Sequence, residues 1–134
     1  ERRSWTEKFN DPRPHQVKPV PTDIAGMKKG EIMLIPTPKI VDAFIAKIPA
    51  GQAMDVKTFR GKLAKKYKAE VSCPITTSIH LRTVAENALE QHRKGAKLSE
   101  ITPFWRVLDE DTPATAKLSC GVAFVTKQRK AEGL

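Results

Sequence analysis

Three amphipathic segments between residues 37 and 95, separated by helix-stopping residues, constrain the fold of this chain more than any other feature. In the first segment, Thr37 is a suitable N-cap, Pro38 suits the first helical position, and Pro49 and Gly51 end the helix. The apolar residues of this segment recur at helical spacing and are Ile40, Val41, Phe44, Ile45 and Ile48. Such a stripe has to be buried against other elements, which favours helices packed around one core.

Two further helices are predicted after the first. Asp55 is placed to cap the second helix. Its apolar face comprises Val56, Phe59, Leu63, Ala64 and Tyr67. Any residue of the range 76–78 (Thr76, Thr77 or Ser78) can cap the third helix, and Gly95 ends it. The predicted apolar stripe of the third helix comprises Ile79, Leu81, Val84, Ala85, Ala88 and Leu89. Two consecutive helices joined by a short link resemble a helix-turn-helix.

The rest of the chain predicts less regular structure. The proline-rich residues 1–30 are typical of an extended arm, which Trp5 and Phe9 are candidates to pin to the body. A short apolar run at residues 31–35 fits a strand or a helix, and residues 121–134 fit a final helix. We therefore predict a mainly α fold with a small β component. It has an N-terminal arm over residues 1–36, which includes a candidate short strand, and one helical domain over residues 37–134.

Positive charge is concentrated in one third of the chain. The formal net charge is +9, and residues 55–99 carry ten Lys or Arg against four Asp or Glu. Residues 1–54 carry nine against six, and residues 100–134 carry five against five. A localised positive face favours a polyanionic partner, with nucleic acid ahead of a membrane surface. The alternative is a solvated basic surface that serves only solubility.

Targeting segments and metal-binding motifs are not recognisable in the sequence. No apolar run approaches the roughly 20 residues that span a bilayer, and the first residues lack a signal-peptide core, so we expect a cytoplasmic protein without membrane contact. There, Cys73 and Cys120 are expected to be reduced and buried, although a disulfide or a catalytic Cys73 paired with His80 is an alternative. Three scattered histidines without a CxxC motif predict no metal site, and no cofactor is expected.

Four short segments point to a known family. They are IPAGQAMDVKTFRGKLAKKY (48–67), RTVAENAL (82–89), TPFWRV (102–107) and KAEG (130–133). They resemble, in this order, the helix-turn-helix entry, the recognition helix R-x-V-G-x-A-M, the active-site segment P-C-H-R-V and the closing E-G of the O6-alkylguanine-DNA alkyltransferases. The recognition-helix match contains one extra residue. The resemblance covers residues 38–134 and implies a winged helix-turn-helix DNA-binding domain of the alkyltransferase type.

The same resemblance makes the PFWRV segment the expected lesion pocket. Phe104 and Trp105 stand where the family has its alkyl-accepting cysteine and the histidine that helps to form the thiolate. Because an arene is no nucleophile and an indole cannot relay a proton as imidazole does, we expect no alkyl transfer. The chain is instead similar to alkyltransferase-like proteins, which bind alkylated DNA without repairing it. Phe104 and Trp105 would then line a pocket for a flipped base, or else be plain core aromatics, while Arg106 ties the local backbone together.

Base flipping is implied at three further positions. Arg82 corresponds to the family's arginine that replaces the extruded base, whereas Thr83 takes that place if the register is counted back from Ala88. The alternative for Arg82 is a surface arginine that pairs with Glu86. Phe59 stands where the family has a tyrosine that helps to turn the target nucleotide, and it has no hydroxyl to bind a phosphate.

Contacts with DNA are expected along the second and third predicted helices. Ala85 and Ala88 would let the third helix approach a groove closely, or would pack against other helices. The phosphate-contact candidates are Lys57, Arg60, Lys62, Lys65, Lys66, Arg93, Lys94 and Lys97. The expected function is non-enzymatic recognition of alkylated double-stranded DNA by a monomer, with repair-pathway proteins as further candidate partners. The alternative is a basic module for DNA, RNA or protein on the same fold, without lesion specificity.

Overall fold

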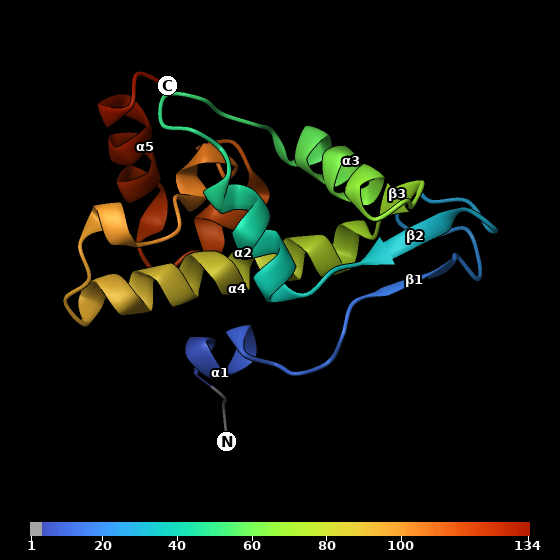
Figure 1. The fold of residues 1–134 in the computed structure, drawn as a ribbon. Coiled ribbons are helices and arrows are strands. Elements are labelled where there is room, and N and C mark those ends of the chain that lie inside the picture. Colours follow the sequence, from blue (N-terminus) through green and yellow to red (C-terminus); the bar gives the residue numbers. More distant parts are fainter. Residues whose placement is uncertain (1–3) are drawn as a thin grey trace.

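Helices form most of the molecule in the computed structural model, which describes residues 4–134 (Figure 1). The longer helices are α2 (Pro38–Ala46), α3 (Val56–Lys66), α4 (Pro74–Arg93) and α5 (Gly121–Ala131), and a short α1 (Trp5–Phe9) precedes them. In the view of Figure 1, α4 runs across the molecule, with α2 and α3 above it and α1 below. Among residues 4–134, no helix combines the length and apolar character needed to cross a membrane.

A small sheet lies at one end of the helical body. Its strands are β1 (Gln16–Pro19), β2 (Ile32–Ile35) and β3 (Val71–Ser72), in the order β1-β2-β3. β1 pairs with β2 in antiparallel fashion, and β3 pairs with β2 in parallel. Of the two alternatives for residues 31–35, the structure contains the strand, and the mainly α fold with a small β component is confirmed.

The N-terminal segment does more than extend along the surface. It supplies two of the three strands and also the short helix α1. Val20 and Met27 are buried, and they pack with Met33 and Cys73 in a second, smaller core cluster. Phe9 packs against the main core, as predicted for a residue that pins this segment to the body.

The helix boundaries agree with the sequence where a side chain caps the helix. Thr37 and Asp55 cap α2 and α3 by accepting hydrogen bonds from backbone amides of the first turn. The predicted start of α4 at residues 76–78 is wrong, because the helix already begins at Pro74 and its N-cap, Cys73, makes no side-chain cap bond. Pro74 sets the helical start through its fixed φ. Gly95, with φ +112°, follows the end of α4 as expected.

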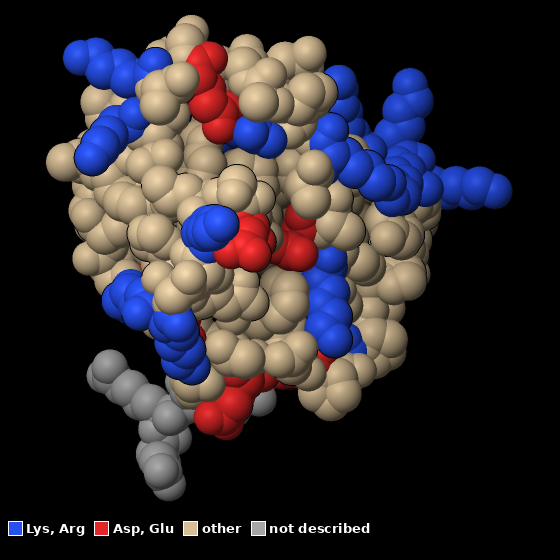
Figure 2. All heavy atoms as spheres, turned by 60° about the vertical axis from the view of Figure 1, so that its left-hand side comes forward, with Lys and Arg blue, Asp and Glu red and all other residues tan. Residues whose placement is uncertain are grey.

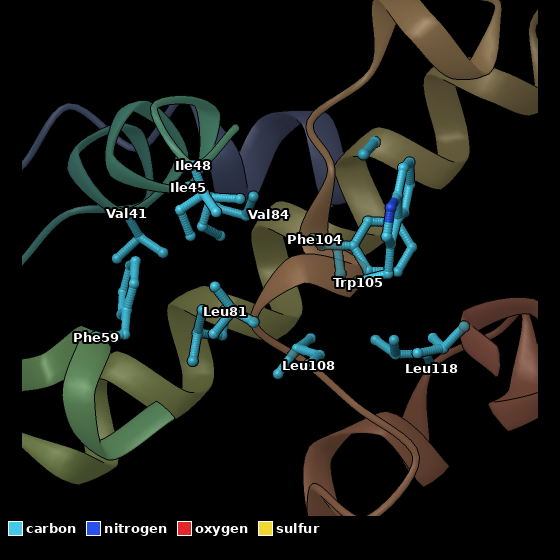
Figure 3. Close-up of a cluster of buried hydrophobic side chains, with 14 of the residues drawn as sticks. Val41, Ile45, Ile48, Phe59, Leu81, Val84, Phe104, Trp105, Leu108 and Leu118 are labelled. Carbon is cyan, nitrogen blue, oxygen red and sulfur yellow. The ribbon is translucent and has the colours of Figure 1, made fainter. Parts of the chain in front are cut away.

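The main core lies between α2, α3, α4, α5 and the segment that contains Phe104 (Figure 3). The α4 residues of the predicted apolar stripe are buried there, with one exception. Ile79 is 58% exposed, so its assignment to the stripe is wrong. It lies two positions before Leu81, about 200° around the helix, and therefore on the opposite side of α4.

Candidate nucleic-acid interface

The PFWRV segment forms a 3-10 turn (Phe104–Arg106) whose aromatic rings point into the core. Phe104 has no exposed surface, stacks on Phe124 with ring centroids 6.1 Å apart, and meets Trp105 edge-on at 5.2 Å. Trp105 is 4% exposed. Figure 3 shows both rings among the other core side chains. The structure therefore gives Phe104 the core role, and the interpretation of its ring as a pocket wall needs correction because the ring presents no surface to a ligand.

One carboxylate ties this segment to two other parts of the chain, and we call this group of contacts the Glu132 clamp. Glu132 accepts hydrogen bonds from Trp105 Nε1 at 2.9 Å and from Arg106 Nε and Nη2 at 2.8 and 3.0 Å. It also accepts from the Gly51 amide at 3.2 Å, while Arg106 Nη1 donates to the Ile48 carbonyl at 2.7 Å. The hydrogen bonds from Arg106, more than any other contact, lower the pKa of Glu132 to about 2. Arg106 thus has the structural role predicted for it.

The surface beside the clamp does not favour an anionic ligand. A hollow of about 590 Å³ lies next to Trp105 and Arg106, and two carboxylates, Glu100 and Glu132, line it. The nearby Arg129 is engaged as well, because it donates to the Trp105 carbonyl at 2.7 Å and pairs with Glu110 at 3.2 Å. At the predicted lesion pocket, Phe104 and Trp105 are therefore buried, and Arg106 is paired with Glu132.

A second groove lies beside α4 and has the opposite electrostatic character; we call it the Arg82 groove. It has a volume of about 660 Å³ and is lined by α1, the start of α3, the exposed side of α4 and the segment 108–117. Three cations (Lys8, Arg82 and Lys117) and the ring of Trp5 contribute to its walls. Its apolar lining includes Val56, Ile79, Leu81 and Leu108. No acidic side chain of residues 4–134 lines this groove.

Arg82 lies against the tryptophan of the N-terminal segment. Its guanidinium carbon is 5.3 Å from the centroid of the Trp5 ring, and Lys8 Nζ is 4.3 Å from the same centroid. Arg82 Nε is buried and has no hydrogen-bond partner among the described residues. The alternative, in which Arg82 pairs with Glu86, is wrong, because Glu86 is buried and accepts hydrogen bonds from the amide and hydroxyl of Ser119 at 3.1 and 2.5 Å.

The other two base-flipping candidates are not available to a nucleotide. The Thr83 hydroxyl donates to the Ile79 carbonyl at 3.0 Å, and the side chain is 4% exposed. Phe59 is fully buried and meets Phe44 edge-on at 5.3 Å. The base-flipping interpretations of Thr83 and Phe59 therefore need correction, since both side chains serve the interior. Of the three candidates, Arg82 alone reaches the surface.

The small residues of α4 are core residues. Ala85 has no exposed surface and Ala88 is 1% exposed. They allow α4 to approach the elements packed on its inner side, where both belong to the main core cluster. Of the two alternatives for these alanines, helix packing is the one observed, and close approach to a DNA groove would have to use other residues of α4.

The predicted phosphate contacts fall into two separate groups. On α3, Lys57, Lys62, Lys65 and Lys66 are exposed and Arg60 is half-buried. Beyond them, Arg93, Lys94 and Lys97 are exposed at the C-terminal end of α4, which Figure 1 places on the opposite side of the molecule from α3. Figure 2 shows Lys and Arg side chains gathered at the upper right of one face, with acidic side chains among basic ones nearer its centre. The cations thus do not form one continuous face.

Like charges crowd at one end of the α3 group. A side-chain hydrogen bond from Lys47 and its positive charge lower the pKa of Lys66. The Lys66 ammonium also lies 5.8 Å from the centroid of the Phe44 ring. Neighbouring ammonium groups raise the local positive potential, which favours an anion that neutralises both.

The two cysteines are free and lie outside the Arg82 groove. Cys73 is buried in the smaller core cluster, and Thr76 Oγ1 lies 3.4 Å from its sulfur. Burial raises the pKa of the Cys120 thiol. Among the described residues, no hydrogen bond joins Cys73 to His80, whose own pKa burial lowers. Among residues 4–134, neither thiol forms a hydrogen bond with a histidine.

Sequence reasoning missed most of the groove. Trp5 was expected to hold the N-terminal segment, and nothing in the sequence assigned a role to Lys8, Leu108 or Lys117. The one available signal was a tryptophan followed three residues later by a lysine in a segment otherwise rich in proline. A scan against protein-family models, a search of curated proteins and a search of solved structures found no match to this chain.

Proposed function

We propose that this chain binds double-stranded DNA without catalysis and receives an extruded, alkylated guanine in the Arg82 groove. The observation that carries this proposal is the groove itself, in which three cations and a tryptophan meet without a carboxylate among the described residues. A cavity of about 660 Å³ lies within the range of about 300–1,000 Å³ that is usual for small-ligand sites. The lack of acidic groups favours a ligand with negative charge.

The arrangement of elements supports a DNA-binding domain of the winged helix-turn-helix type. α3 and α4 follow each other with only residues 67–73 between them, and that link contains β3. β3 joins the β1-β2 hairpin, so the sheet stands directly beside the helix pair. In such domains the second helix of the pair contacts the DNA groove. In this chain the second helix is α4, which carries Arg82.

The proposed mechanism separates docking from recognition. The exposed lysines of α3 attract the phosphate backbone, in a manner that depends on salt and not on sequence. Arg82 then occupies the space of the extruded base, since a guanidinium stacks and donates several hydrogen bonds at once. The extruded base enters the groove beside Trp5, whose side chain is only half-buried. Stacking of a base on an aromatic ring contributes about 1–3 kcal/mol.

The chemistry of the groove lining supports the proposal that no alkyl group is transferred. Neither Cys73 nor Cys120 belongs to it, and the position of the family's acceptor cysteine is Phe104. Within the described residues, the groove lining contains the hydroxyl residues Ser78, Thr83 and Thr112 but no histidine or carboxylate. A hydroxyl without an adjacent base is a weak nucleophile.

Fluorescence anisotropy with short labelled duplexes tests the proposal. One duplex carries a single O6-methylguanine and the other is unmodified, and both are titrated across a salt series. We expect a preference of at least about tenfold, or 1.4 kcal/mol, for the modified duplex. Arg82→Ala should abolish the preference. Arg82→Lys should only reduce it, because lysine keeps the positive charge but lacks the planar guanidinium. The control Lys127→Ala, on an exposed residue of α5, should retain it.

The burial of Phe104 favours a second candidate, a basic DNA- or RNA-binding module without lesion specificity. In that case both duplexes bind equally, and their affinities fall steeply with salt. Absence of binding to either duplex at low salt would contradict both candidates.

A further inference from the structure

Two exposed isoleucines form a ridge on α4, and one of them, Ile79, lines the Arg82 groove. Ile75 is 50% exposed and Ile79 is 58% exposed. With Ser78 and Arg82 they occur at spacings of three and four residues, so all four share one face of the helix. We call Ile75 and Ile79 the isoleucine ridge. This face is apolar along its first turns and ends in a cation.

Folding alone does not account for this ridge. Single exposed apolar residues are common on protein surfaces, whereas contiguous exposed apolar residues are typical of interaction surfaces. Ile79 borders two hollows at once, the Arg82 groove and a hollow of about 410 Å³ between α4 and the N-terminal segment. Ile79 therefore projects between two depressions rather than filling either of them.

Cations lie on both sides of the ridge. Lys8 lines both hollows, and Lys117 lines the Arg82 groove. On the other side, Arg13 lines the second hollow, where it forms a 2.8 Å ion pair with Asp11. The ridge is thus an apolar strip between a groove with three cations and a hollow in which two cations, Lys8 and Arg13, outnumber one carboxylate, Asp11. This is the complement of a DNA minor groove, which has base edges along its floor and a phosphate backbone on either side.

We infer that Ile75 and Ile79 form an apolar wedge that enters the minor groove of duplex DNA and opens a base step next to Arg82. This inference rests on the DNA-binding function proposed above. Aliphatic side chains inserted between base steps partly unstack them and bend the duplex. The wedge would lower the cost of extruding a base beside Arg82, and it would act on undamaged DNA as well.

Two ridge variants test the wedge against one matched control at another exposed isoleucine. Ile79→Ala and Ile75→Ala remove the ridge, and Ile24→Ala removes an isoleucine that is 47% exposed in the β1-β2 connection. Affinity is measured by anisotropy on two unmodified duplexes, one with a central TpA step and one with GpC. Bending is measured by energy transfer between dyes at the duplex ends. Thermal unfolding checks that each variant is folded.

Wild-type protein should bend the TpA duplex and bind it more tightly than the GpC duplex, because pyrimidine–purine steps open most easily. Ile79→Ala should lower affinity for the TpA duplex about three- to tenfold and reduce the bend, while thermal unfolding stays unchanged. Ile75→Ala should act in the same direction, and Ile24→Ala should match the wild type.

Two results would overturn the inference, and they are distinguishable from each other. If Ile79→Ala binds and bends both duplexes like the wild type while Arg82→Ala loses binding, the ridge is not a wedge, although the proposed function stands. A ridge that serves a protein partner would give this result. If the wild type binds no duplex at low salt, the proposed function fails and the wedge fails with it.

Discussion

The Glu132 clamp and the Arg82 groove use the same residue types to opposite effect. In the clamp, Trp105 and Arg106 share one carboxylate, and Trp105 is buried. In the groove, Trp5 and Arg82 contact each other, Trp5 is only half-buried, and no carboxylate of the described residues lines the site. A tryptophan and an arginine therefore do not identify a binding site by themselves. The presence or absence of an internal anion decides whether they hold the fold or remain available to a ligand.

The largest expected effect is a loss of folding stability in the buried region beside the Glu132 clamp. Phe104→Ala should lower the free energy of unfolding by about 3–5 kcal/mol, because it leaves a cavity among packed core side chains. Urea denaturation measures the loss, and Phe104→Leu should cost less because it retains most of the apolar volume. If Phe104→Ala kept its stability and lost only lesion preference, Phe104 would belong to the binding site after all.

The clamp carboxylate should matter next. Glu132→Gln keeps the shape of the side chain but removes the charge that Arg106 pairs with at 2.8 Å. We expect a loss of about 2 kcal/mol in unfolding free energy, typical of a hydrogen bond to a charged group. The control is Glu110→Gln, which removes the charge that pairs with Arg129. The Glu110 side chain is 44% exposed. The exposed Arg129–Glu110 pair should contribute less than about 1 kcal/mol to the free energy of unfolding. Equal losses of unfolding free energy in the two variants would argue against a special role for the clamp.

The same carboxylate should give the fold a defined acid sensitivity. Its pKa is about 2 in the folded chain, against an ordinary value of 4.5, so folding favours the ionised form. This stabilisation is complete above pH 4.5 and is lost as the pH falls towards 2. Unfolding free energies at about pH 6, 4 and 2.5 should therefore converge between wild type and Glu132→Gln. A constant difference across this range would show that the ionisation of Glu132 is not coupled to folding.

The smallest effect on stability is expected at the groove. Arg82→Ala removes a cation–π contact with Trp5, which costs less than about 1 kcal/mol at a partly exposed site. Its DNA affinity, in contrast, should fall markedly. Arg106→Ala should show the reverse pattern, with a large loss of stability and little change in DNA affinity of the folded protein. Denaturation measures the stability of both variants, and anisotropy measures their DNA affinity. If each variant lost both stability and affinity, the clamp and the groove would not have separate roles.

Local signals in the sequence predicted the helices well. Thr37 and Asp55 were recognisable as caps because a side-chain cap and the helix it begins are adjacent in the chain. The start of α4 was missed because Cys73 gives no such signal. Ile79 was assigned to the wrong side of α4, because the predicted apolar stripe included residues from two sides of the helix.

Nonlocal geometry could not be predicted in the same way. Phe104 follows a proline in a segment compatible with either a pocket or a core, and only its packing against Phe124 distinguishes them. The Arg82 groove joins four stretches of chain that are far apart in sequence, from Trp5 to Lys117. For Arg106, a structural role was predicted from its planar guanidinium, whereas its distant partners, Glu132 and the Ile48 carbonyl, were not.

The placement of the two tryptophans also gives the protein two optical reporters. Trp105 is enclosed beside Glu132, whereas Trp5 stands at the boundary with solvent, near two cationic side chains. With Trp5 replaced by phenylalanine, the remaining indole emission follows unfolding of the closed region. With Trp105 replaced instead, the emission follows whatever enters or leaves the neighbourhood of Arg82. Ligand binding and loss of structure can thus be followed separately, without an attached dye.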